Sequence, residues 1–71
     1  MKRQPVNSTV LSSEAYDEAL QTLELQFRDK GVVWQYYNIP KKVYRQFKEA
    51  ESLGNFFVTR IKGHYPEAKI G

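Results

Sequence analysis

The middle of the chain alternates hydrophobic and polar positions with a period of two. Leu23, Leu25 and Phe27 are separated by polar side chains, which predicts a β-strand with one buried face. Gly31 closes the Asp-Lys-Gly sequence that follows and can adopt the positive φ of a tight hairpin turn. Residues 32–39, VVWQYYNI, are rich in β-branched and aromatic side chains. An antiparallel hairpin is therefore predicted.

The second strand of this hairpin has two different faces. Val32, Trp34 and Tyr36 share one face, whereas Gln35 and Tyr37 lie on the other. Burying the second face would bury Gln35, so the face of Trp34 is predicted to point into the core. Tyr37 is then the aromatic ring left on the outer face.

A helical period begins after Pro40, which cannot donate to a β-ladder but suits the first turn of a helix. Val43, Phe47 and Ala50 recur at i, i+4 and i+7, and Gly54 is expected to stop this helix.

A second, shorter helix is predicted within residues 55–63. Phe57 and Ile61 are four residues apart on it, and Gly63 is expected to close it. The remaining residues, 64–71, are predicted to form a tail docked through Tyr65.

The N-terminal part has a weaker pattern. Residues 1–9 carry few apolar side chains and are predicted to be a disordered segment, with a single domain over 10–70. Residues 10–13 indicate the start of a short strand, with a turn at residues 16–21, and a helix over residues 14–20 is the alternative. The predicted fold class is α+β: an antiparallel meander of two to three strands, followed by two α-helices packed on one face.

Composition narrows the range of functions. The chain has no cysteine and one histidine, so disulfides, thiolate metal sites and cysteine nucleophiles are excluded, and we expect no metal or cofactor. Ser12, Ser13, Asp17 and His64 lack the framing motifs of a catalytic triad, and no enzymatic activity is expected. No apolar run is long enough for a membrane span. We expect a cytoplasmic protein.

Charge is unevenly distributed along the chain. The net charge is +3 overall, −2 over residues 1–27 and +5 over residues 28–71. Lys41, Arg45 and Lys48 share one face of the first predicted helix, with Lys42 beside them. The first turn has no acid, and cations there oppose the helix dipole. A basic stripe of this kind can follow a phosphate backbone, although a solvated helix face is the simpler interpretation.

A second basic group surrounds Gly63, where Arg60 and Lys62 precede the glycine. This group could contact phosphate, or it could complement the dipole at a helix C-terminus. Tyr37, on the outer face of its strand, is a candidate for stacking on a base.

The ordered set of motifs resembles the KTSC domain family, named for its occurrence at the C-terminal end of some lysyl-tRNA synthetases and also found as small stand-alone bacterial and phage proteins. The matching residues are Ser12-Ser13, Tyr16-Asp17, Leu23 through Phe27, Tyr36, Ile39-Pro40, Tyr44, Ala50, Ser52, Gly54, Phe57, Ile61, Gly63 and Tyr65-Pro66.

Two positions depart from the family pattern. Trp34 replaces the first tyrosine of a Tyr-x-Tyr motif, and Val58 replaces an asparagine. The resemblance implies a small α+β domain, and its synthetase context suggests RNA binding.

Two functions are therefore predicted. The first is a non-catalytic nucleic-acid-binding accessory module, with RNA favoured. The alternative is a protein-protein interaction module in a bacterial or phage setting. The residues expected to contact nucleic acid are Lys41, Lys42, Arg45, Lys48, Arg60, Lys62 and Tyr37.

Overall fold

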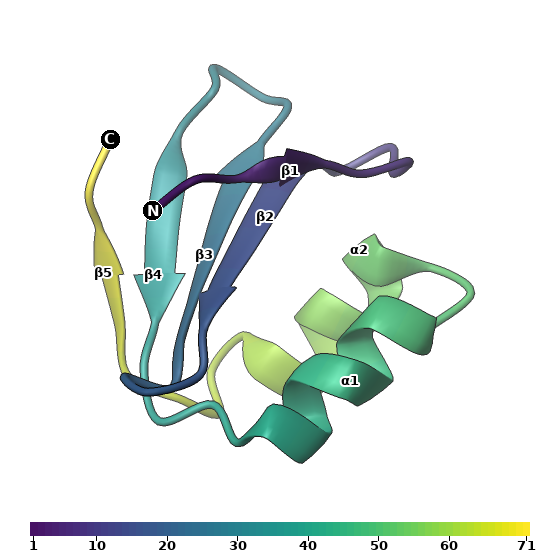
Figure 1. Ribbon diagram of the computed structural model, residues 1–71. Coiled ribbons are helices and arrows are strands. Elements are labelled where there is room, and N and C mark those ends of the chain that lie inside the picture. Colours follow the sequence, from purple (N-terminus) through teal and green to yellow (C-terminus); the bar gives the residue numbers. More distant parts are fainter.

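The computed structural model describes all 71 residues, as a five-stranded antiparallel sheet with a helical layer on one side (Figure 1). The strands are neighbours in the sheet in the order in which they occur in the sequence. The helices follow the fourth strand in the sequence and precede the fifth. The elements are β1 (Gln4–Pro5), β2 (Leu11–Asp17), β3 (Thr22–Phe27), β4 (Val33–Tyr36), α1 (Lys41–Glu49), α2 (Leu53–Phe56), the π-helical segment η1 (Phe57–Ile61) and β5 (Glu67–Lys69).

The α+β class is confirmed, but the expected number of strands was wrong: the sheet has five strands rather than two or three. The predicted tail forms β5, which pairs with β4 and places Glu67 opposite Tyr36. Its three residues are too few to show a period. β2 extends through Asp17 and pairs with β3, which excludes the alternative helix over residues 14–20.

The core lies between the sheet and the helical layer. Leu23 pairs with Tyr36 and Leu25 with Trp34, so these four side chains share the helix-facing side of the sheet. The predicted orientation of β4 is therefore confirmed. The buried cluster consists of Leu11, Leu23, Leu25, Tyr36, Ile39, Phe47, Phe57 and Ile61, and Phe27, Trp34 and Val43 pack against it.

The helical layer departs from prediction at Gly54. α1 ends earlier, at Glu49, because Ala50 is extended. Ser52 then begins α2, its side-chain oxygen accepting from the backbone N–H of Asn55 at 3.1 Å. Gly54 is buried within α2 instead of stopping α1, and a Cβ there would lie 2.8 Å from the side chain of Val10. This glycine permits close packing rather than a positive φ.

The two predicted turn glycines are confirmed. Gly31 has φ of +65° in the β3–β4 hairpin, next to Lys30 with φ of +62°. Gly63 has φ of +81° and follows η1. At the end of η1, the N–H of Lys62 donates to the carbonyl of Phe57 at 2.8 Å, a spacing of five residues.

The N-terminal residues contact the sheet rather than extending away from it. β1 pairs with the outer edge of β2, and Arg3 bonds to Ser13 of β2 and Glu24 of β3. Ser13 and Glu24 lie on the side of the sheet opposite the helices, since they alternate with Glu14 and Leu25. The segment before β1 thus crosses the outer face, as the ribbon also shows (Figure 1). No helix has the length and hydrophobicity needed to cross a membrane.

Candidate functional site

Two of the six predicted basic residues are neutralised by acids. The ammonium of Lys41 lies 3.2 Å from a carboxylate oxygen of Glu18, and both side chains are exposed. Lys48 lies 2.8 Å from the carboxylate of Glu14, a side chain with only 2% of its surface exposed. Lys41 and Lys48 therefore contribute less positive charge to the surface than the predicted stripe requires.

Lys48 belongs to a polar cluster that joins α1 to β2. The hydroxyl of Tyr44 donates to Glu14 at 2.9 Å, and its ring stacks on Tyr16 with centroids 4.2 Å apart. The hydroxyl of Tyr16 in turn donates to the carbonyl of Ile39 at 2.5 Å. Burial, together with the hydrogen bond to Glu14, raises the pKa of Tyr44. This cluster fixes the helix on the sheet.

The other four predicted cations are exposed and form no salt bridge: Lys42 and Arg45 on α1, Arg60 on η1 and Lys62 directly after it. The guanidinium of Arg60 lies 5.3 Å from the ring centroid of Phe56, a cation–π contact. Phe56 itself contacts Phe47 of α1, with centroids 6.0 Å apart. All four cations thus belong to the helical layer, and we call them the helical-layer cations.

Tyr37 does not lie with these cations. Its hydroxyl donates to Gln35 at 3.0 Å, and Gln35 donates to Glu24 at 2.8 Å. Both partners are on the outer face of the sheet, so the half-buried ring of Tyr37 lies on the side opposite the helical layer. The predicted combination of Tyr37 with the basic stripe is not formed on one surface.

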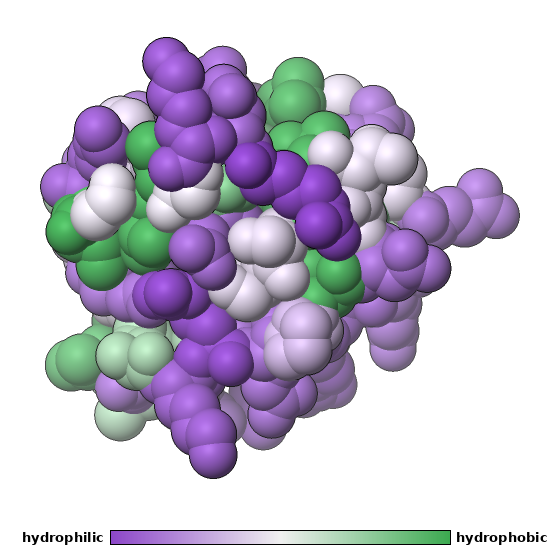
Figure 2. Space-filling model, turned by 90° about the horizontal axis from the view of Figure 1, so that it is seen from above, coloured by the Kyte–Doolittle hydropathy of each residue, from purple (hydrophilic) through white to green (hydrophobic).

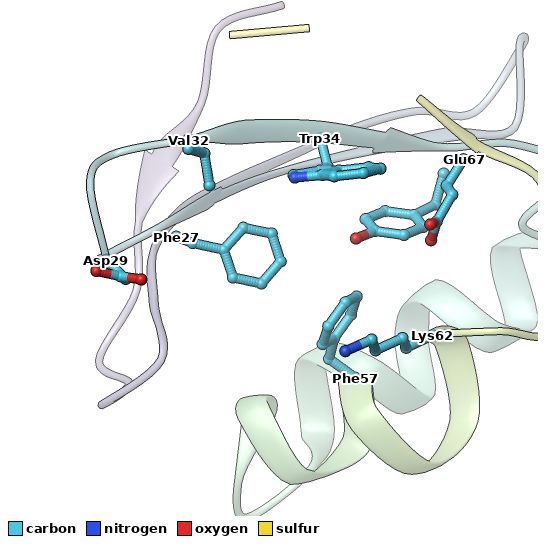
Figure 3. A pocket seen from close by; sticks show the side chains of 8 residues that line it. Phe27, Asp29, Val32, Trp34, Phe57, Lys62 and Glu67 are labelled. Carbon is cyan, nitrogen blue, oxygen red and sulfur yellow. The ribbon is translucent and has the colours of Figure 1, made fainter. Parts of the chain in front are cut away.

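A pocket that the sequence did not predict opens between the sheet and η1. Its volume is about 300 Å³. Figure 3 shows Phe27 and Trp34 reaching it from the sheet and Phe57 from the helical side, with Lys62 beside Phe57. We call it the aromatic pocket, and its lining residues are Phe27, Asp29, Val32, Trp34, Tyr36, Phe57, Lys62 and Glu67.

Only part of this pocket was recognisable beforehand. Trp34 and Tyr36 stand out as an aromatic pair on one strand face, which predicts burial in the core. Glu67 reaches the pocket because β5 adds to β4, a pairing that its sequence does not indicate. No group of three or more histidine, cysteine or acidic residues is arranged to hold a metal ion.

Comparison with known proteins shows which family this chain belongs to. The sequence model of the KTSC domain family matches residues 7–65. The chain belongs to the KTSC domain family. The crystal structure of a KTSC domain protein from Yersinia pestis superposes with a TM-score of 0.92 at 41% identity, covering 99% of this chain and 97% of that one.

Sequence relatives include both stand-alone and larger proteins. A protein from Tsukamurella paurometabola is 40% identical over 62 residues, 87% of this chain and 91% of the relative. An uncharacterised protein from Stutzerimonas stutzeri is 39% identical over 80% of this chain and 79% of its own length. A lysine–tRNA ligase from Nostoc punctiforme is 33% identical over 80% of this chain, which corresponds to 10% of the ligase.

Proposed function

We propose that this KTSC domain is a non-catalytic module that binds single-stranded nucleic acid, RNA in preference, through phosphate contacts. The helical-layer cations carry the proposal. Lys42, Arg45, Arg60 and Lys62 are all exposed, and none has an acidic partner. When unpaired cationic side chains neutralise phosphates, the counterions condensed on the nucleic acid are released. This release supplies most of the affinity in such complexes.

The relative in Nostoc punctiforme supports RNA over DNA. That protein is a lysine–tRNA ligase, and a segment of it resembles most of this chain. A basic accessory domain in such an enzyme would act on the same RNA as the catalytic part, so we extend RNA binding to this chain as part of the proposal.

The distribution of hydrophobic side chains favours this function over protein docking. The exposed large hydrophobic residues belong to five separate segments: Met1, Val10, Leu20, Val58 and Ile70. In the view of Figure 2, hydrophilic side chains cover most of the surface, and the hydrophobic ones form separate patches. A protein-interaction module would instead be expected to expose one continuous apolar area.

A salt titration tests the proposal. Four phosphate contacts predict that log K for single-stranded RNA falls with log salt concentration at a slope of about −3. The variant Lys42→Gln/Arg45→Gln should retain its fold and lose about 1.4 of this slope, since each contact on a single strand accounts for about 0.7.

Lys30→Asn is the matched control. Lys30 is exposed in the β3–β4 hairpin, outside the helical layer, and asparagine tolerates its positive φ. It removes one charge but should leave the slope within about 0.3 of the parent value. Failure of the parent to bind RNA at low salt would contradict the proposal and favour a protein partner. A loss of about 0.7 in Lys30→Asn, half the loss of the double variant, would show that binding follows net charge alone.

A further inference from the structure

The aromatic pocket offers walls suited to a flat ring. Phe27 and Tyr36 each contact Phe57 edge-on, with centroids 5.3 Å apart in both pairs. Trp34 also lines the pocket, two residues before Tyr36 on the same face of β4. Figure 3 shows the labelled rings facing a common space between the sheet and η1. At about 300 Å³ the pocket is at the small end of ligand sites, the size for one heterocycle rather than an extended molecule.

The hydroxyl of Tyr36 has no partner within the chain. The residue is only 3% exposed, and its hydroxyl makes none of the hydrogen bonds of the structure, in contrast to Tyr16, Tyr37 and Tyr44. No side-chain polar atom is both fully buried and unsatisfied, so this hydroxyl retains a small opening to the pocket that Tyr36 lines. A ligand acceptor there would complete a hydrogen bond that is otherwise missing.

A carboxylate acceptor lines the same pocket. Glu67 pairs with Tyr36 across β4 and β5 and lines the same pocket, and it forms no salt bridge. Burial, followed by the charge of Glu67, raises the pKa of Tyr36, so the hydroxyl is a donor at neutral pH. The pocket is therefore lined by an O–H donor and a carboxylate acceptor from paired positions on adjacent strands.

We propose that the aromatic pocket holds one unpaired nucleobase of the bound strand, which rests on the proposed RNA-binding function. The ring stacks among Phe27, Trp34 and Phe57. Its Watson–Crick edge, which on every base places a hydrogen-bond donor beside an acceptor, meets Glu67 and Tyr36. Lys62, at the side of the pocket (Figure 3), contacts the phosphate of the same or an adjacent nucleotide.

Trp34 makes the proposal measurable, because it is the only tryptophan. Titration with an oligouridylate should quench its fluorescence as the base stacks beside it. The same oligonucleotide carrying N3-methyluridine keeps every phosphate and ring but loses the N–H that would meet Glu67. Its affinity should be about 10-fold lower, the value of one hydrogen bond to a charged group.

Two substitutions test the polar contacts. Tyr36→Phe should lower the affinity for the unmodified oligonucleotide about 3- to 10-fold while the salt slope stays constant. Glu67→Gln should also weaken binding, although removing a negative charge would by electrostatics alone strengthen it. Glu51→Gln, an equal charge change at an exposed residue between the two helices, should not weaken binding.

The outcomes separate this inference from the proposed function. Salt-dependent RNA binding without quenching of Trp34, or with full affinity in Tyr36→Phe and for the N3-methylated strand, would overturn the base pocket and leave phosphate binding intact. Absence of RNA binding would overturn both. Circular dichroism of each variant, with a midpoint of unfolding at or near that of the parent, confirms that lost affinity reflects the pocket.

Discussion

Lys48 and Glu14 form an ion pair across the interface between helix and sheet. The ammonium of Lys48 lies 2.8 Å from the carboxylate of Glu14. The side chain of Glu14 is 2% exposed, whereas that of Lys48 is 39% exposed. Solvent thus reaches one partner but hardly the other. Such a pair stabilises chiefly because its loss would leave a buried carboxylate with fewer partners.

Lys48→Gln should therefore lower the free energy of unfolding by about 1 to 3 kcal/mol, because only the hydrogen bond from Tyr44 would remain on Glu14. Lys41→Gln is the matched control, since Lys41 and Glu18 are both exposed, and it should cost about 0 to 1 kcal/mol. Urea unfolding measures both. Equal losses would indicate that burial of Glu14 is unimportant.

Glu24, on the outer face of the sheet, should make the stability of the domain depend on pH. Burial alone would raise the pKa of this carboxyl, but hydrogen bonds from Gln35 and Arg3 and the positive N-terminus outweigh it, so the pKa of Glu24 lies below its usual range. A lowered folded pKa stabilises the fold above the unfolded value, about 4.3, and this contribution is lost as the pH falls through the folded pKa.

Arg3→Gln should make stability less dependent on pH in the acid range, because Glu24 would lose one of the groups that lower its pKa. The midpoint of urea unfolding, followed from about pH 6 to pH 3, checks this. Lys2→Gln, at the neighbouring exposed position, should keep the parent profile. A parent whose stability is constant across this interval would contradict the assignment.

Phe47 should contribute more to stability than its ring partner Phe56. Phe47 is fully buried, whereas Phe56 is only partly buried. Phe47→Ala is expected to cost about 3 to 5 kcal/mol through lost burial and an unfilled cavity, a large share of the stability of so small a domain. Phe56→Ala should cost clearly less. A Phe47→Ala variant with the parent's midpoint of unfolding would exclude this core.

Gly54 should not tolerate a methyl group. The Cβ of alanine would lie 2.8 Å from the Cγ2 of Val10 and 3.0 Å from its Cβ, so Gly54→Ala should lower the free energy of unfolding by about 1 to 3 kcal/mol. Val10→Ala in the same chain removes the nearer atom and should recover part of this loss. Additive losses in the double variant, measured by a double-mutant cycle, would argue against steric contact as the cause.

The fold was predictable where several residues shared one period. Leu23, Leu25 and Phe27 define β3, and the spacing of Val43 and Phe47 defines α1. β5 was missed because three residues carry no detectable alternation and are held by pairing with β4. Gly54 was misplaced because a glycine needed for close packing against Val10 looks in sequence like a helix stop.

The candidate site was less predictable than the fold. Sequence identifies the cations of α1, but not that Glu18 and Glu14, distant in sequence, neutralise Lys41 and Lys48. It separates Tyr36 from Tyr37 by face, yet gives no sign that the buried ring rather than the outer one lines a pocket. Long-range pairing decides both points.

The hydroxyl of Tyr36 should be dispensable for folding even though its ring is part of the core. Tyr36→Phe removes a hydroxyl without a hydrogen-bond partner from a residue that is 3% exposed, so stability should remain unchanged or rise by up to about 1 kcal/mol. Tyr16→Phe is the contrasting variant, because that hydroxyl donates to the carbonyl of Ile39 at 2.5 Å. It should lose about 1 to 2 kcal/mol.

Measured together with RNA affinity, these two substitutions distinguish a structural hydroxyl from a binding one. Tyr36→Phe should weaken RNA binding while keeping stability, and Tyr16→Phe should lower stability while the folded protein binds as before. If Tyr36→Phe instead destabilises the domain as much as Tyr16→Phe, its hydroxyl has a partner in the folded chain. The donor that the aromatic pocket offers to a base would then be absent.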